Sequence, residues 1–264
     1  MTLDDIFLGN SGRKTVDPYE AIAPIYDRIM AHVEYDKWAA FIAGILREET
    51  DWPPKVLELA CGTGIMAEKL AGFGLHVTGY DLSPAMIEQA KKKKAYQDKL
   101  CFRVGDFASF PQDEKHDAVI CLYDSINYLM NYEEVAEFMS RAAGVLNPQG
   151  VFIFDICTRY NSYTNFRGFV DEGEIGSYYY FRHSNYSPKT HIHTNDFLLY
   201  NRSDSTVQYR EHHEQYIYSV KQIQSAVKAA GLKLEMKYDD IYPVPARIKS
   251  LRIHFLCRNI SEAD

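Results

Sequence analysis

Short apolar runs alternate with amphipathic segments between residues 55 and 156. The short runs predict buried strands, and the apolar positions at helical spacing predict helices between them. This alternation is typical of a parallel sheet with helices on both faces. The expected strands cover 56–60, 76–80, 100–104, 118–122 and 151–156, and the expected helices cover 65–72, 84–95 and 132–145.

Two more helices are expected upstream of this region. Asp17 can cap a helix, Pro18 suits its first position and Glu20 completes a capping-box pattern. A second helix is expected around residues 38–46, before the breaker Trp52-Pro53-Pro54. Residues 1–16 are polar and contain glycine, so we expect them to form a mobile arm.

The pattern changes after Ile156. Residues 159–218 contain alternating segments at 178–180, 190–200 and 207–218, separated by turn signals, which predicts antiparallel strands. A helix is then expected at 220–230 and strands at 233–238 and 251–258. We therefore expect a core of residues 17–158 and 219–264, interrupted by an antiparallel β insert at 159–218.

Charge and composition disfavour several function classes. The net charge of −7 argues against a nucleic-acid partner, which needs a concentrated basic surface. The chain has neither an apolar leader nor an apolar run of roughly 18 residues, so we expect a cytoplasmic protein without a membrane partner. The 20 tyrosines indicate an aromatic-lined pocket. Four histidines, His191, His193, His212 and His213, lack a cysteine or fixed carboxylate partner, so we expect no metal site.

The segment from Val56 to Gly64 predicts a strand that runs into a glycine turn and then a helix. Gly62-x-Gly64-x-x-Ala67 fits a dinucleotide-binding fingerprint, which leaves a nicotinamide dehydrogenase open. The acids Glu58, Asp81 and Asp106 lie at the ends of three consecutive strands: Glu58 is at the end of the first, and Asp81 and Asp106 follow the second and third. They would repel a pyrophosphate and attract the sulfonium and ammonium groups of S-adenosylmethionine. Each acid taken alone also fits a purely structural role, as a loop cap or turn starter.

Five segments resemble, in order, the motifs of the class I S-adenosylmethionine-dependent methyltransferases: residues 58–64, 79–86, 105–107, 117–125 and 146–150. Residues 26–38, 123–129 and 211–215 are similar to a bacterial subgroup containing YqeM-like methyltransferases and, more distantly, sugar-amine N-methyltransferases. The resemblance implies a Rossmann-like α/β fold. We therefore expect a seven-stranded, mostly parallel sheet with helices on both faces, and an antiparallel β insert after strand five that acts as a lid.

The same resemblance implies how the cofactor would bind, with S-adenosylhomocysteine as product. Gly62 and Gly64 would lie against the methionine and ribose, and Asp81 would bind the ribose hydroxyls. Leu82, Met86, Asp106 and Phe107 would contact the adenine. Tyr26 and Trp38, on the N-terminal helices, would close over the cofactor or simply pack in the core. The cofactor-binding residues are thus expected to be Tyr26, Trp38, Glu58, Ala60, Gly62, Gly64, Asp81, Leu82, Met86, Asp106, Phe107, Cys121 and Leu122.

The acceptor is expected beyond the carboxyl ends of the strands. Asp124 could orient a cationic amine or cap the next helix, and His213 could act as a base or as a structural histidine of a polar strand pair. We list Asp124 and His213 as catalytic candidates. The substrate-binding candidates are Tyr123, Asp124, Ser125, Asn127, His213 and Tyr216.

These features predict a methyltransferase for a small-molecule acceptor, N- or O-directed, with an amine favoured by the acidic and aromatic composition. Such an enzyme acts mainly by alignment and requires no nucleophilic residue. A non-catalytic S-adenosylmethionine-binding protein and a tRNA-modifying methyltransferase are the alternatives. We expect a monomer or a homodimer.

Overall fold

The computed structural model describes residues 13–107 and 110–260. Its larger sheet has the order β12-β11-β13-β6-β5-β2-β3-β4. The parallel part consists of β2 (Lys55–Leu59), β3 (His76–Asp81), β4 (Leu100–Val104), β5 (His116–Cys121) and β6 (Leu146–Cys157). Antiparallel pairing adds β13 (Arg252–Asn259), β11 (Leu232–Asp239) and β12 (Tyr242–Pro245). The Rossmann-like fold expected from the sequence is confirmed.

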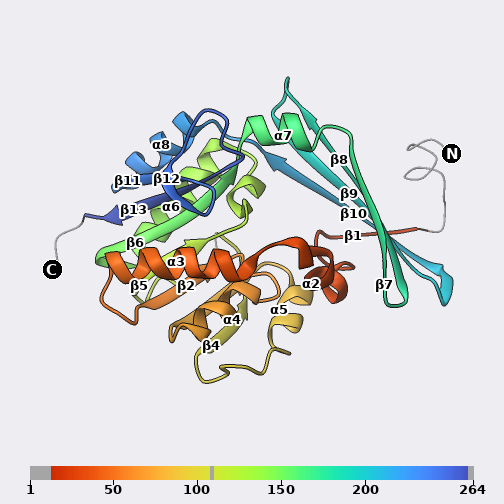
Figure 1. Ribbon diagram of the computed structural model, residues 1–264, viewed down its shortest axis with the longest axis horizontal. Helices are drawn as coiled ribbons and strands as arrows, with labels where there is room; N and C mark the ends of the chain where they lie inside the picture. The colour runs from red at the N-terminus through yellow and green to blue at the C-terminus, as the bar shows by residue number, and fades with distance from the viewer. Residues whose placement is uncertain (1–12, 108–109, 261–264) are drawn as a thin grey trace.

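Helices cover both faces of this sheet (Figure 1). Alternate residues of β2, β5 and β6 enter two separate cores, as the period of a strand requires. One core is covered by α6 (Tyr132–Gly144) and α8 (Val220–Ala229). The other is covered by α3 (Tyr35–Glu49), α4 (Ile65–Gly72) and α5 (Pro84–Ala90).

The sheet has eight strands among the described residues, one more than expected. The extra strand, β12, follows a turn at Asp240, where φ is 54°, and pairs with the end of β11. β12 was not expected from the sequence because all of its residues are exposed. Such a strand lacks the alternation of apolar and polar residues that predicts a half-buried strand.

The helix expected to begin at Asp17 is not formed. Tyr19 has a φ of 65°, which a right-handed helix excludes, and residues 18–20 form a turn. Helical structure begins only with η1 (Ala23–Ile25), followed by α2 (Tyr26–Ile29) and η2 (Met30–His32). This turn brings Tyr19 toward the main cavity described below.

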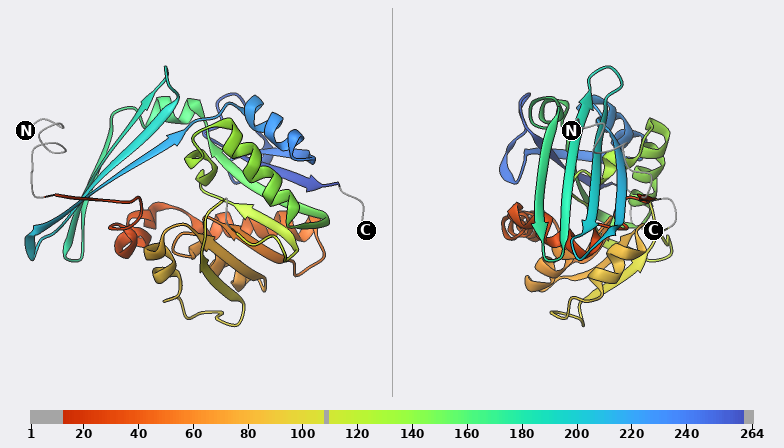
Figure 2. Two further views of the ribbon diagram at one scale, coloured as in Figure 1. Left: turned by 180° about the vertical axis from the view of Figure 1, so that it is seen from behind. Right: turned by 90° about the vertical axis from the view of Figure 1, so that its right-hand side faces the viewer.

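A second, five-stranded sheet has the order β1-β10-β9-β8-β7. It contains β7 (Phe169–Ile175), β8 (Tyr178–Ser187), β9 (Ile192–Asn201) and β10 (Asp204–Tyr216), and it follows the short helix α7 (Arg159–Asn165). Figure 2 shows these strands side by side, projecting from one end of the larger sheet. β7 and α7 were not expected from the sequence.

The fifth strand, β1 (Lys14–Val16), pairs in parallel with residues 209–211 of β10. Residues 14–16 were expected to belong to a mobile arm, whereas they are part of this sheet. Residues 1–12 lie outside the described part of the chain.

Candidate active site

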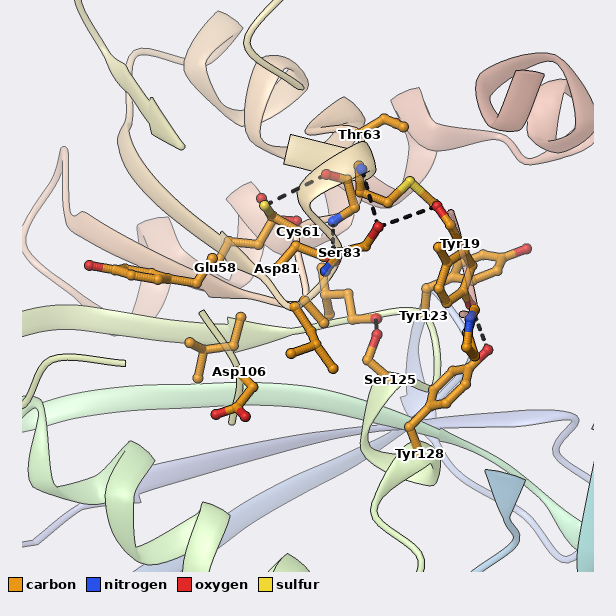
Figure 3. A pocket seen from close by; sticks show the side chains of 18 of the residues that line it. Tyr19, Glu58, Cys61, Thr63, Asp81, Ser83, Asp106, Tyr123, Ser125 and Tyr128 are labelled. Atoms are coloured by element: carbon orange, nitrogen blue, oxygen red, sulfur yellow. Dashed lines mark hydrogen bonds between the residues drawn. The ribbon is translucent and has the colours of Figure 1, made fainter. Parts of the chain in front are cut away.

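A cavity of about 1200 Å³ opens at the carboxyl ends of β2, β3, β4 and β5. Its walls come from the loops that follow these strands, and the turn at residues 17–20 closes one side (Figure 3). Ligand sites in open α/β sheets lie at this edge. Most residues expected to contact the cofactor line it: Tyr26, Trp38, Glu58, Ala60, Gly62, Asp81, Leu82, Met86, Asp106, Phe107 and Leu122.

The glycine turn has the left-handed backbone that its sequence predicts. Ala60, Gly62 and Gly64 have φ values of 57°, 55° and 74°. Gly64 does not line the cavity. A Cβ at this position would lie 2.6 Å from Cζ of Phe102, so Gly64 allows the turn to pack against the core behind it. Cys121 is fully buried and is also absent from the cavity wall.

Asp81 is held in place by the turn. Its two carboxylate oxygens accept hydrogen bonds from the backbone amides of Gly62, at 2.8 Å, and Ser83, at 2.9 Å. Burial raises the pKa of Asp81, and these two hydrogen bonds oppose the rise because they favour the charged carboxylate. The arrangement orients the carboxylate at the cavity wall before any ligand binds.

The described cavity wall is acidic. It includes seven carboxylic acids and no Lys, Arg or His among the described residues. Burial, together with the charge of Asp81, raises the pKa of Glu58 to about 8. One oxygen of Glu58 is buried and has no hydrogen-bond partner. Such a wall favours cations and disfavours phosphates. The seven acids are Asp17, Glu20, Glu58, Asp81, Glu88, Asp106 and Glu134.

The turn after β5 places Tyr123 and Ser125 at the cavity. Tyr123 and Asp124 have φ values of 62° and 52°, and their backbone amides donate to the buried carboxylate of Asp155 at 2.6 and 2.9 Å. Asp155 also pairs with Arg252. The positive φ values make this turn strained, and the hydrogen bonds to Asp155 keep it in place.

Asp124 itself does not line the cavity. Its carboxylate lies 2.7 Å from the guanidinium of Arg252 and accepts a hydrogen bond from Gln215 at 2.8 Å. Asn127 is fully buried, where it donates to the carbonyl of Tyr216 and accepts from the amide of Cys157. These contacts of Asp124 and Asn127 hold the turn after β5 against β10.

His213 and Tyr216 also lie outside the cavity wall. His213 is 1% exposed and touches two residues that do line the cavity: it is hydrogen-bonded to Tyr128, and its ring lies 4.7 Å from that of Tyr19. The ring of Tyr216 packs on Tyr218, with centroids 4.7 Å apart. Tyr19 and Tyr128 were not among the expected site residues, although the segment 123–129 carried a family resemblance. They reach the cavity from a turn and a 3-10 helix, η3 (Ser125–Tyr128).

Trp38 lines the cavity and also packs in the core. It is 6% exposed, and its ring lies 5.4 Å from that of Tyr123 and 5.2 Å from the guanidinium of Arg252. Tyr26 likewise lines the cavity, beside Tyr19, with ring centroids 5.8 Å apart. Both residues therefore line the cavity, and Trp38 is also part of the core; their contact with the cofactor stays a prediction.

The four histidines considered for a metal site are dispersed. His193 and His213 are buried, whereas His212 points to the other side of β10 and pairs with Asp196. Within residues 13–107 and 110–260, no three His, Cys, Asp or Glu side chains gather as metal ligands would. None of the helices in the described part of the chain has the length and apolarity needed to cross a membrane.

Comparison with known proteins agrees with this geometry. A family model described as a methyltransferase domain matches residues 56–150. The chain is 30% identical over 240 residues to YqeM of Bacillus subtilis (strain 168), which is named as a methyltransferase; the match covers 90% of this chain and 95% of YqeM. It is 27% identical over 221 residues to dTDP-3-amino-3,6-dideoxy-alpha-D-glucopyranose N,N-dimethyltransferase of Streptomyces fradiae, covering 81% and 84% of the two chains.

A solved structure is similar over nearly the whole fold. The crystal structure of an S-adenosylmethionine-dependent methyltransferase from Clostridium acetobutylicum ATCC 824 has a TM-score of 0.77 and 26% identity to this chain, and the match covers 91% of this chain and 98% of the other. Three features match the requirements of such an enzyme. They are the cavity at the carboxyl ends of the strands, the Asp81 carboxylate held by two backbone amides, and the acidic cavity wall. The chain belongs to the S-adenosylmethionine-dependent methyltransferase family.

Proposed function

We propose that this enzyme methylates an amine of a small-molecule acceptor. The acidic cavity wall carries this proposal, because seven carboxylic acids without a basic residue among the described lining residues select cationic ligands. An alkyl amine is cationic near neutral pH, whereas a phenol is neutral. The relative from Streptomyces fradiae is named for the same chemistry on an amino sugar.

The cavity is large enough for two ligands. Its volume of about 1200 Å³ exceeds the roughly 300–1,000 Å³ typical of a site for one drug-sized molecule. Asp81 would bind the ribose of S-adenosylmethionine, and Asp106 would bind the adenine amino group. Glu58, one of whose oxygens has no hydrogen-bond partner, would face the sulfonium and ammonium groups. When bound, S-adenosylmethionine supplies an electrophilic methyl group on a sulfonium.

The acceptor would lie beside Tyr19, Tyr123 and Ser125, on the side of the cavity toward the five-stranded sheet. We propose that residues 159–218 form the acceptor lid of a core comprising residues 17–158 and 219–264. The contribution of the protein is alignment of the acceptor nitrogen with the methyl group and exclusion of water, which together lower the barrier strongly.

The first test is methyl transfer to a panel of matched amines, phenols and carboxylates, followed by mass spectrometry. The panel includes 3-amino-3,6-dideoxy-D-glucose with and without its dTDP group, and the 3-hydroxy counterpart of each, because the acidic wall disfavours phosphates. We expect methylation of amines only, and methylation of the hydroxy compound alone would contradict the proposal. Binding of S-adenosylmethionine without transfer to any compound would favour the non-catalytic alternative.

A variant tests the cofactor site separately. Asp81→Asn should weaken S-adenosylhomocysteine binding by about tenfold or more in calorimetry, because it removes a charge-assisted hydrogen bond. Asp36→Asn is the control, since Asp36 lies on exposed helix surface with an 84% exposed side chain. Equal affinities of the two variants would contradict the assigned role of Asp81.

A further inference from the structure

Four side chains form a continuous hydrogen-bonded chain from the cavity into the five-stranded sheet. The hydroxyl groups of Tyr19 and Tyr128 lie 2.6 Å apart, as Figure 3 shows. The Tyr128 hydroxyl lies 3.0 Å from Nδ1 of His213, and Nε2 of His213 lies 3.1 Å from Oε2 of Glu211. Tyr19 and Tyr128 line the cavity, whereas His213 and Glu211 are each 1% exposed.

Glu211 determines which group donates and which accepts in this series of hydrogen bonds. Its carboxylate accepts hydrogen bonds from the backbone amides of Tyr19 at 2.8 Å, Ala21 at 2.5 Å and Ile22 at 2.9 Å. Donors of this kind favour the ionised carboxylate. An ionised Glu211 then accepts the Nε2 proton of His213, which leaves Nδ1 as an acceptor for the Tyr128 hydroxyl. Tyr128 in turn accepts from the Tyr19 hydroxyl, so that a Tyr19 lone pair remains for a donor in the cavity.

Acidic and phenolic groups surround the two tyrosines and His213. His213 is in contact with Glu211 on its own strand, with Tyr128 from η3, and with the ring of Tyr19, 4.7 Å away. Asp81 and Asp124 act electrostatically on Tyr19, and Asp124, Tyr26 and Glu211 act on Tyr128. Burial raises the pKa of both phenols, which therefore stay protonated and can pass a proton along.

We propose that Tyr19 and Tyr128 relay a proton from the acceptor's ammonium group to His213, with Glu211 as the positioning residue that holds His213 in the accepting tautomer. This inference rests on the proposed amine acceptor. An N–H bond of the ammonium breaks, its proton moves to the Tyr19 oxygen, the Tyr19 proton moves to Tyr128, and the Tyr128 proton moves to Nδ1 of His213. The nitrogen lone pair thus freed would form the new N–C bond to the methyl group that S-adenosylmethionine supplies, while the S–C bond breaks and its electron pair stays on the sulfur of S-adenosylhomocysteine.

The charges balance over a turnover. The positive charge of the ammonium is transferred to the imidazole, where the carboxylate of Glu211 stabilises it. After the product leaves, the imidazolium returns its proton along the same chain to water in the cavity. The proton transfer requires no side chain other than the four named above and no reactant other than this water.

The experiment compares pH profiles of kcat/KM for His213→Asn, Tyr128→Phe and the wild type, with the amine of the panel above that the wild type methylates fastest as the acceptor. At pH 7 each variant should lose about 10²-fold, the usual effect of losing proton transfer. The loss should shrink to below about threefold at a pH above the amine's own pKa, where bulk water has already removed the proton. His212→Asn, the neighbour on the opposite side of the strand, should match the wild type throughout.

The outcomes separate relay from structural damage. A loss that is equal at every pH, or no loss at pH 7, overturns the relay even though amines are methylated. If the wild type methylates no amine, the proposed function fails, and the relay fails with it. S-adenosylhomocysteine binding by calorimetry checks that each variant is folded, and Tyr128→Phe keeps the ring and removes only the hydroxyl.

Discussion

At the scale of one residue, Glu58 is expected to make the binding of S-adenosylmethionine depend on pH. Its pKa of about 8 means that the carboxyl is mostly protonated at pH 7 in the ligand-free protein. A cationic ligand beside it favours the carboxylate and lowers that pKa. Binding of S-adenosylmethionine at pH 7 should therefore release about one proton, and affinity should rise as pH increases toward 8 and then level off.

Calorimetry in buffers of different ionisation enthalpy measures this release. Glu58→Gln should abolish it, and proton release that persists in this variant would assign it to another group. In the ligand-free protein the raised pKa has the opposite consequence: the free energy of unfolding should fall as pH rises from 4.5 to 8, because Glu58 ionises in the unfolded chain over this range but keeps its proton when buried.

The positions of residues were predictable where the backbone alone determines them. A loop that follows a parallel strand ends at the ligand edge of the sheet, so Asp81 and Asp106 reach the cavity. Side-chain direction beyond a turn is not determined in this way. Asp124 was expected to face the acceptor, but Arg252 and Gln215, from distant parts of the chain, hold it away from the cavity wall.

The turn after β5 shows how one element depends on another. Asp155 on β6 accepts both turn amides and pairs with Arg252 on β13. Asp155→Ala should lower the free energy of unfolding by about 3–5 kcal/mol, because it leaves buried donors and a buried charge without this partner. Urea unfolding measures the effect.

An exposed pair serves as the control for that prediction. Glu174 pairs with Arg202, and both side chains are more than half exposed. Glu174→Ala should unfold at nearly the same urea concentration as the wild type, since exposed ion pairs contribute little. Similar losses in the two variants would mean that Asp155 contributes no more than a surface charge.

Strand β10 fastens the five-stranded sheet to the rest of the molecule. Alternate residues Glu211, His213 and Gln215 face the core side, as the strand period predicts, and each bonds to it. Glu211→Ala should lower the free energy of unfolding by about 3 kcal/mol, because three backbone amides lose their acceptor. Glu214→Ala, on the exposed side of the strand, should change it by less than about 0.5 kcal/mol. An unaffected Glu211→Ala variant in urea unfolding would contradict this account.

Elements with a strong period were predicted from the sequence, and elements without one were not. α4 has the predicted bounds, and β3 extends one residue beyond its prediction. β7 has half-buried and exposed residues in alternation but no fully buried one, so its apolar signal was weak. The turn at Tyr19 looked like a helix start because a capping sequence does not report the tertiary bonds that Glu211 provides.

At the scale of the whole molecule, the Rossmann-like core follows from local patterns, whereas the junction of the two sheets does not. β1 pairs with residues 195 positions away in the chain, as in the register of Lys14 with Tyr209. No periodicity within either segment records such a pairing. The acidic wall is likewise a property of the fold, since its seven acids come from five separate parts of the sequence.

The five-stranded sheet is held to the rest of the molecule through β9 and β10, and this has a consequence for how such enzymes diversify. Glu211 and Gln215 of β10 bond to the core, and Phe197 and Leu199 of β9 are buried against the N-terminal helices, whereas β7 at the edge of the sheet has no fully buried residue. A library that randomises the exposed positions of β7 and leaves β9 and β10 intact would thus explore new sequences without sacrificing the fold. The same architecture can in this way be inherited by lineages that methylate quite different compounds.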